Sequence, residues 1–251
     1  MPGAALPPDV RLVALDSVDS TNEEAKRRAR AGAPDRTLIC AATQTAGRGR
    51  GGRAWISPPG NLHLSLVLRP DCPARRAAEL GFVAAVGVAA ALLDIAADLP
   101  LAFKWPNDVL LRGRKLAGIL IEADSHSAGA LDWLVLGLGV NVASHPSGTA
   151  FPATSLRAEG VTGVGVETIR DGFAGRFLEA MQVWQRSGFA PIRERWIARA
   201  AGIGSVITVR LPNATLRGTF VDLDADGALL LAPGTNDGPV RRITAGDVFF
   251  G

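Results

Sequence analysis

Strand-like and helix-like segments are mixed along the chain up to residue 201, and their order constrains the fold more than any other feature. In NLHLSLVL (61–68), for example, leucine fills every second position, as in a strand with one buried face. Strands and helices do not alternate one by one, so the sequence predicts an α+β core rather than a parallel βαβ sheet. The expected strands cover residues 10–18, 37–44, 61–68, 101–111, 115–124 and 132–142, and the expected helices cover 19–32, 74–98 and 166–201, the last broken near Gly188.

The first helix has a clear start signal. Ser20 and Thr21 are favourable N-cap residues, and each has a glutamate three positions later, at Glu23 and Glu24. This spacing predicts a capping box, in which the two side chains satisfy the first free backbone N–H groups. Gly32 is expected to end the helix.

The composition changes near Gly202. From there to the end, short β-rich runs are separated by Pro-Asn, Asp-Gly and Pro-Gly turn signals. This pattern is typical of a small β barrel or sandwich. The sequence therefore predicts two domains, residues 1–202 and residues 203–251.

Charge and hydrophobicity exclude several classes of protein. The chain is 47% hydrophobic and 20% charged, which is typical of a folded domain, and its net charge of +3 is too small to require a nucleic-acid partner. The first residues lack the pattern of a signal peptide, and the apolar run at 81–93 is too short to span a bilayer. The two cysteines, Cys40 and Cys72, lack metal-ligand spacing and are expected to be reduced, which favours the cytoplasm.

The segment TQTAGRGRGGRAW (43–55) concentrates positive charge on a flexible backbone. Glycines let backbone N–H groups converge on an anion, and arginine offers planar donors that match phosphate and carboxylate. A solvated hairpin turn and an RNA-binding Arg-Gly tail are the alternatives. The single copy, set between two strand-like runs, favours a ligand loop that is mobile in the absence of ligand.

Three further polar positions stand beside apolar strands. In FKWPNDVLL (103–111), Pro106 allows a turn that places Asn107 and Asp108 at a strand end, where oxygen donors suit Mg²⁺ or a ribose hydroxyl; an ordinary turn is the alternative. Lys115 enters a buried strand and requires an anionic partner, unless it extends along the strand edge to solvent. Asn141 ends another strand, where its amide could contact a base or cap a turn. A P-loop and a complete dinucleotide fingerprint are both absent from the sequence.

Taken together, these segments resemble the biotin protein ligases. The resemblance rests on DSTN (19–22), TQTAGRGRGGRAW (43–55), KWPNDVLL with RKLAGILIE (104–122), LGLGVNV (136–142) and ATSL (153–156), found in the family's order. It implies a mixed sheet flanked by helices, related to class II aminoacyl-tRNA synthetases, followed by an SH3-like barrel.

The resemblance also implies a two-step reaction. Biotin's carboxylate attacks the α-phosphate of ATP to give biotinyl-5′-adenylate and pyrophosphate. A lysine of a biotin carboxyl carrier domain then attacks this mixed anhydride, which forms an amide and releases AMP. A lipoate-type ligase on the same scaffold is the nearest alternative, and an RNA-binding protein that uses the Arg-Gly segment is a more distant one.

Residue roles follow from the same resemblance. Arg48 and Lys115 are expected to be catalytic, and Asp108 is expected to lie towards Mg²⁺. The expected biotin-binding residues are Ser20, Thr21, Asn22, Gln44, Arg48, Gly49, Arg50, Lys115 and Gly118, the last leaving room for the bicyclic ring. The expected ATP-binding residues are Arg48, Arg50, Arg53, Trp55, Asn107 and Asn141.

Some members of the family carry an N-terminal helix-turn-helix that binds DNA. Here the first expected strand begins near Val10, so we expect no sequence-specific DNA binding and no membrane association. The sequence is compatible with either a monomer or a homodimer.

Overall fold

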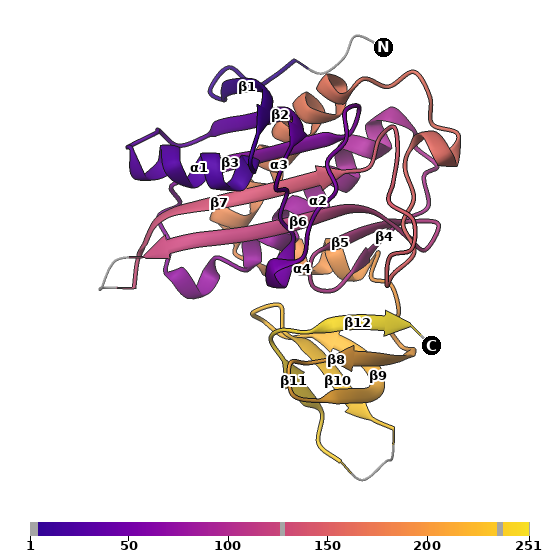
Figure 1. Cartoon of the computed structure of the whole chain (residues 1–251). Helices are drawn as coiled ribbons and strands as arrows, with labels where there is room; N and C mark the ends of the chain where they lie inside the picture. The colour runs from indigo at the N-terminus through magenta and orange to yellow at the C-terminus, as the bar shows by residue number, and fades with distance from the viewer. Residues whose placement is uncertain (1–4, 126–128, 235–237, 251) are drawn as a thin grey trace.

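The structure is a computed structural model that describes residues 5–125, 129–234 and 238–250, so the predicted domain limits at residues 1 and 251 lie outside it. A seven-stranded sheet forms the larger part, in the order β1-β2-β3-β7-β6-β5-β4 (Figure 1). Only β1 and β2 pair in parallel within it; its other neighbours are antiparallel. The strands are β1 (Arg11–Val18), β2 (Thr37–Gln44), β3 (Leu62–Leu68), β4 (Leu101–Lys104), β5 (Asp108–Leu111), β6 (Arg114–Ser125) and β7 (Leu131–Val140).

Helices cover both faces of this sheet. Helix α1 (Thr21–Arg30) packs on β2, β3 and β7, where Ala25 and Ala29 contact a small apolar cluster. Helices α2 (Glu79–Ile95), α3 (Val166–Ser187) and α4 (Ala190–Ile197) enclose the main core on the opposite face. The alternating leucines of β3 belong to the main core and Val67 to the small cluster, so every residue of this strand is buried.

Helix α2 lies in the core of the protein. By length and composition alone, the helical segment Ala74–Ile95 is apolar enough to cross a membrane. However, 67% of its most apolar window is buried inside the protein, as in the core helix of a globular domain. Gly87 explains part of this close packing, because a Cβ there would lie 2.9 Å from the backbone of Phe177 on α3.

A second, five-stranded antiparallel sheet follows α4, in the order β11-β10-β9-β8-β12. It contacts the first part of the chain through Trp105, whose indole N–H donates to the carbonyl oxygen of Gly227 at 3.0 Å. Arg193 of α4 likewise donates to the carbonyl oxygen of Leu223 at 2.9 Å. The strands are β8 (Val206–Arg210), β9 (Thr215–Leu223), β10 (Leu229–Pro233), β11 (Arg241–Ile243) and β12 (Asp247–Phe250).

The predicted α+β class is confirmed, and the helix break at Gly188 (φ 74°) lies where it was expected. The turn expected at Pro106 is present at Trp105–Asn107, and it divides residues 101–111 into the hairpin β4–β5 rather than one continuous strand. One local prediction was wrong. The capping box is absent: the Ser20 side chain makes no cap hydrogen bond, and Glu23 and Glu24 pair with basic side chains instead.

Candidate active site

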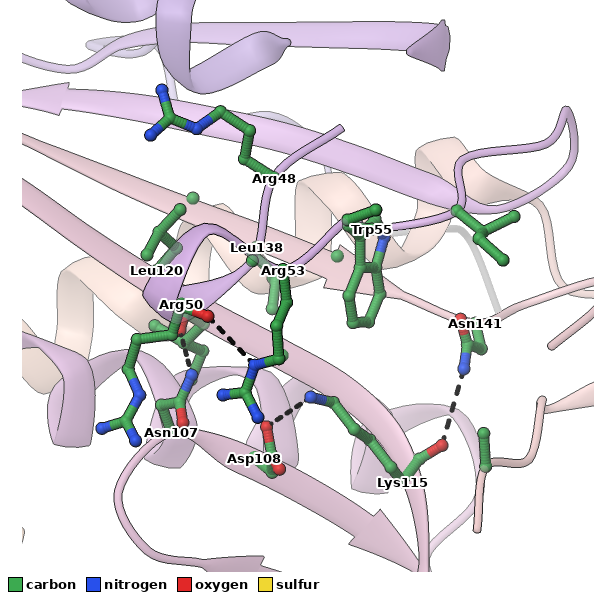
Figure 2. Close-up of a pocket in the computed structure, with 18 of the residues that line it drawn as sticks. Arg48, Arg50, Arg53, Trp55, Asn107, Asp108, Lys115, Leu120, Leu138 and Asn141 are labelled. Carbon is green, nitrogen blue, oxygen red and sulfur yellow. Dashed lines mark hydrogen bonds and ion pairs between the residues drawn. The ribbon is translucent and has the colours of Figure 1, made fainter. Parts of the chain in front are cut away.

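A cavity of about 290 Å³ lies at the end of the large sheet, between the 43–57 segment, the 144–155 segment and β12. Figure 2 shows part of its lining, with Trp55, Lys115 and Asn141 among the labelled residues. Its walls thus come from distant parts of the chain. All fourteen residues to which the sequence assigned a binding or catalytic role line this one cavity: Ser20, Thr21, Asn22, Gln44, Arg48, Gly49, Arg50, Arg53, Trp55, Asn107, Asp108, Lys115, Gly118 and Asn141.

A buried hydrogen-bond network forms the polar end of the cavity. Thr21 donates from its backbone N–H and its hydroxyl to Gln44 Oε1, at 2.8 and 3.0 Å. Asn22 accepts from the Ser65 hydroxyl at 2.6 Å and donates to Glu122 Oε2 at 2.8 Å. The side chains at the start of α1 are therefore held by β2, β3 and β6, which explains why they do not cap their own helix.

A β-bulge in β6 directs Lys115 into the cavity. The pairing of β5 with β6 shifts between Val109 and Leu110, so that Leu110 lies opposite Lys115 and Leu116 is the extra residue. Leu116 and Ala117 are both fully buried in the core, whereas Lys115 and Gly118 line the cavity. Without the bulge, strict alternation would place Lys115 on the core side, so this irregularity orients the ammonium group.

Asp108 lies between two lysines. Its Oδ1 forms an ion pair with Lys115 Nζ (Figure 2), at 2.7 Å. Its Oδ2 accepts a hydrogen bond of 3.0 Å from Lys104 Nζ. Burial alone would raise the pKa of Asp108, but the two ammonium groups hold that pKa below its ordinary value. The carboxylate is therefore ionised and fully engaged.

This arrangement does not fit a magnesium ion held by Asp108, in contrast to the role expected from the sequence. Mg²⁺ is usually held by one or two carboxylates together with waters and substrate phosphates, and here both oxygens of Asp108 already contact ammonium groups. Within residues 5–125, 129–234 and 238–250, no group of three or more His, Cys, Asp and Glu side chains is arranged to hold a metal. Asn107, also expected near Mg²⁺, donates its side-chain N–H to the Ile119 carbonyl oxygen at 2.7 Å and so closes the turn.

Trp55 occupies the space above two glycines. A Cβ at Gly139 would lie 2.5 Å from the indole ring, and a Cβ at Gly118 would lie 3.1 Å from it. Lys115 Nζ is 5.4 Å from the centre of the same ring. Gly118 was expected to leave room for the bicyclic ring of biotin, but in this structure Trp55 and Lys115 take up that room.

The three arginines of the 43–55 segment have carboxylate or carbonyl partners. Arg48 pairs with Glu23 of α1, and its guanidinium points away from Lys115 (Figure 2). Arg50 and Arg53 both reach Asp247 of β12, each at 3.0 Å. The loop is thereby tied to α1 on one side and to the second sheet on the other.

Asn141 connects the 144–155 segment to the sheet. Its side-chain N–H donates to the carbonyl oxygen of Thr154 at 3.0 Å, and the backbone N–H of Thr154 donates to the carbonyl oxygen of Lys115 at 2.9 Å. Asn141 thus positions the chain that continues to Phe151, a residue that lines the cavity. The amide therefore has a structural role, and its expected contact with the nucleotide stays a prediction.

Comparison with known proteins agrees with this geometry. Residues 14–141 match the biotin/lipoate A/B protein ligase family, and residues 202–251 match the biotin protein ligase C-terminal domain. A biotin–[acetyl-CoA-carboxylase] ligase from Paracoccus denitrificans is 42% identical over 94% of this chain and 99% of its own length. The chain belongs to the biotin/lipoate A/B protein ligase family.

Solved structures of biotin protein ligases share the whole fold. The Aquifex aeolicus enzyme in complex with biotin and ATP has a TM-score of 0.78 and 28% identity, covering 95% of this chain and 97% of its own. The Leishmania major enzyme with biotinyl-5-AMP has a TM-score of 0.63 and 27% identity, covering 95% of this chain and all of its own. The resemblance inferred from five short motifs is therefore confirmed, as is the fold of a mixed sheet with an SH3-like C-terminal domain.

In this ligase, sequence reasoning missed several residues that shape the cavity. Ser65 and Glu122 orient the start of α1, Lys104 contacts Asp108, and Asp247 holds the arginine loop. Ser65 and Glu122 could have been identified from the sequence, because both are polar residues within strand-like runs. No sequence pattern indicates a role for Asp247, because only the tertiary fold brings it beside residues nearly 200 positions earlier.

Proposed function

We propose that this chain activates biotin with ATP and transfers it to a lysine of a biotin carboxyl carrier domain. In the first step, a biotin carboxylate oxygen attacks the α-phosphorus, forming biotinyl-5′-adenylate as the bond to pyrophosphate breaks. In the second step, the lysine amine attacks the acyl carbon, forming an amide as AMP departs. The observation that carries this proposal is the gathering of the fourteen expected side chains around one cavity.

Fixed positive charge is what the first step requires. Both reactants are anions, and their repulsion must be reduced before the oxygen and phosphorus atoms can approach. Lys115 presents its ammonium to the cavity and is 27% exposed there, as expected of a group that contacts ligand. We assign Lys115 to the carboxylate and to the phosphate that becomes esterified to it, where it stabilises charge that builds at phosphorus.

Arg48 is the second catalytic cation in this proposal. Its side chain is 46% exposed and pairs with Glu23, an interaction that water screens and that a phosphate can replace. Exchange of Glu23 for an anionic ligand would turn Arg48 towards the cavity and close the loop. A closed loop also keeps water away from the reactive anhydride.

Biotin and the nucleotide would bind at opposite ends of the cavity. We assign biotin's ring to the end formed by Ser20, Thr21, Asn22 and Gln44, where Thr21 and Asn22 are buried and hydrogen bonds to Gln44 and Ser65 already orient them. The nucleotide would lie towards Trp55 and the arginine loop. The chemistry would then belong to residues 1–202, with residues 203–251 holding the loop. Two free cysteines favour a reducing compartment, and we place the reaction in the cytoplasm.

Adenylate formation is the decisive test. The protein is incubated with biotin, ATP and Mg²⁺, and biotinyl-5′-adenylate is detected by mass, with lipoate in a parallel reaction and a carrier domain added in a second stage. We expect adenylate with biotin only, and transfer to one carrier lysine. Lys115→Ala and Arg48→Ala should each reduce the rate by a factor on the order of 100 or more.

Arg217→Ala is the matched control, because Arg217 is exposed on β9 and does not line the cavity. It should retain the wild-type rate. Wild-type turnover in a Lys115→Ala/Arg48→Ala double variant would disprove the assigned roles. Activation of lipoate in place of biotin would disprove the substrate.

A further inference from the structure

Lys104 is a buried cation that the mechanism above does not use. Its side chain is 7% exposed, that of Asp108 is 8% exposed, and that of Lys115 is 27% exposed. All three line the cavity, so the charges form a row in its wall, with the carboxylate in the middle and Lys115 the most exposed. A buried charge is costly unless it is paired, so a second lysine behind Asp108 calls for an explanation.

The backbone fixes the position of Lys104. Lys104 and Asp108 are directly paired residues at the closed end of the β4–β5 hairpin, so their side chains lie on the same face. Asp108 is in turn paired with Gly118 of β6, which also faces the cavity. On its other side, Lys104 Nζ lies 4.7 Å from the centre of the Phe151 ring, a favourable cation–π position.

Counting charges shows what the second lysine does. Lys115 and Asp108 alone form a neutral pair, and a neutral pair attracts a carboxylate or a phosphate only weakly. With Lys104 on the other oxygen, the cluster carries a net charge of +1. Asp108 can then orient the Lys115 ammonium without cancelling its effect on anionic ligands.

We propose that Lys104 is a positioning residue that offsets the charge of Asp108, so that Lys115 is both held in place and effectively cationic towards the two anionic substrates. This inference rests on the proposed function, which supplies the anions. It assigns to the lysine of the KWPND segment, which itself lines the cavity, a role through Asp108 and Lys115.

Three variants separate charge from structure. Lys104→Met keeps the length of the side chain and gives a net charge of 0; Asp108→Asn gives +2; the double variant restores +1. For each we would measure biotin-dependent exchange of pyrophosphate into ATP, which needs no carrier, and the affinity for ATP by calorimetry. Thermal unfolding would confirm that each variant is folded.

We expect Lys104→Met to lower the exchange rate and the ATP affinity by about 10- to 100-fold, the effect of one unit charge a few ångströms away in a partly screened site. The double variant should recover at least half of that loss on a logarithmic scale. An unchanged Lys104→Met variant, or a double variant as impaired as Lys104→Met while folded, would overturn the proposal.

Two further outcomes are also decisive. If Lys104→Met does not fold, Asp108→Asn is compared with the double variant: tighter ATP binding by Asp108→Asn supports the charge count, and equal binding overturns it. If the wild type binds ATP but exchanges no pyrophosphate, the proposed function fails, and the ATP affinities of the four proteins still test the role of Lys104. A wild type that does not bind ATP would overturn both.

Discussion

Asp247 accepts two hydrogen bonds from Arg53, at 3.0 and 3.1 Å, and so joins the C-terminal sheet to the arginine-glycine loop. The same carboxylate accepts a hydrogen bond of 3.0 Å from Arg50. Burial would raise the pKa of Asp247, but the two guanidinium groups, Arg53 first, keep that pKa below its ordinary value. The carboxylate is therefore ionised at neutral pH and pairs with both loop arginines.

Asp247→Ala should release the loop. Exposed ion pairs contribute about 0.2–1 kcal/mol each, so loss of two of them should raise the open population by roughly 2- to 30-fold. Trypsin should then cleave the ligand-free variant faster after Arg48, Arg50 or Arg53, as mass spectrometry of the fragments would show. Asp226→Ala is the control, because Asp226 pairs with Arg242 on the same domain. Equal cleavage rates in both variants would contradict this account.

Gly139 and Gly118 should differ in their tolerance of alanine. The new Cβ would lie 2.5 Å from the Trp55 ring at Gly139 but 3.1 Å from it at Gly118. Gly139→Ala must therefore displace the indole, and we expect at least a tenfold loss of ligand affinity, equivalent to about 1.4 kcal/mol, with a smaller loss for Gly118→Ala. Calorimetry with ATP would measure both.

Gly175→Ala provides the control for that series. Gly175 lies in α3, and a Cβ there would have no neighbour within 4 Å. Alanine should stabilise the helix by about 0.5–1 kcal/mol and leave ligand affinity unchanged. Equal affinities in Gly139→Ala and Gly175→Ala would show that the position of Trp55 is irrelevant to binding.

Much of the fold was predictable because its signals are local. The strand over Thr37–Gln44 has the predicted limits, since a short apolar run is bounded by turn residues on both sides. The alternating leucines of β3 also face one core, as their period of two requires. The cavity residues were predictable as a group because the quoted motifs contain almost all of the polar residues that the sheet brings to one end.

The remaining features depend on tertiary contacts. Ser20 and Thr21 have the local pattern of a capping box, but Thr21 bonds to Gln44 and Asn22 bonds to Glu122 instead. The bulge that orients Lys115 arises from the pairing of β5 with β6, and a strand's own sequence does not contain its register. The engagement of Asp108 by Lys104 likewise depends on the pairing of β4 with β5, which the expected turn at Pro106 does not specify by itself.

Glu122 should control biotin affinity although it does not line the cavity. It accepts hydrogen bonds from Asn22 at 2.8 Å and from Lys26 at 2.9 Å. Burial raises the pKa of Glu122, but these two partners outweigh it and lower the pKa, so the group is ionised. Loss of a hydrogen bond to a charged group costs about 1.5–3 kcal/mol, and Glu122→Ala should weaken biotin binding by roughly 10- to 150-fold.

Glu122→Gln separates orientation from charge. Glutamine retains an acceptor for Asn22 but loses the ion pair with Lys26, so it should recover part of the biotin affinity that alanine loses. Affinity would be measured by calorimetry with biotin alone, in the absence of ATP. Wild-type affinity in Glu122→Ala would show that Asn22 does not depend on Glu122 for its orientation.

His63 should make the stability of this ligase depend on pH. Its ring is only 1% exposed, and Nε2 lies 3.2 Å from the Pro58 carbonyl oxygen. Burial lowers the pKa of His63 from its ordinary value of 6.5, more than the hydrogen bond to Pro58 raises it. The unfolded chain therefore binds a proton more readily than the folded chain as the pH falls below 6.5.

His63→Gln should reduce this dependence. Because the pKa of His63 is lower in the folded chain, its contribution to stability is complete above pH 6.5 and is lost as the pH falls towards the folded-state pKa. The free energy of unfolding then changes by at most about 1.4 kcal/mol per pH unit. Glutamine can still donate to Pro58 but does not titrate. Urea unfolding of both proteins between pH 5 and 7.5 would give the two slopes. The free energy of unfolding should fall more steeply with acid in the wild type than in His63→Gln, and identical slopes would mean that His63 titrates alike in the folded and unfolded chains.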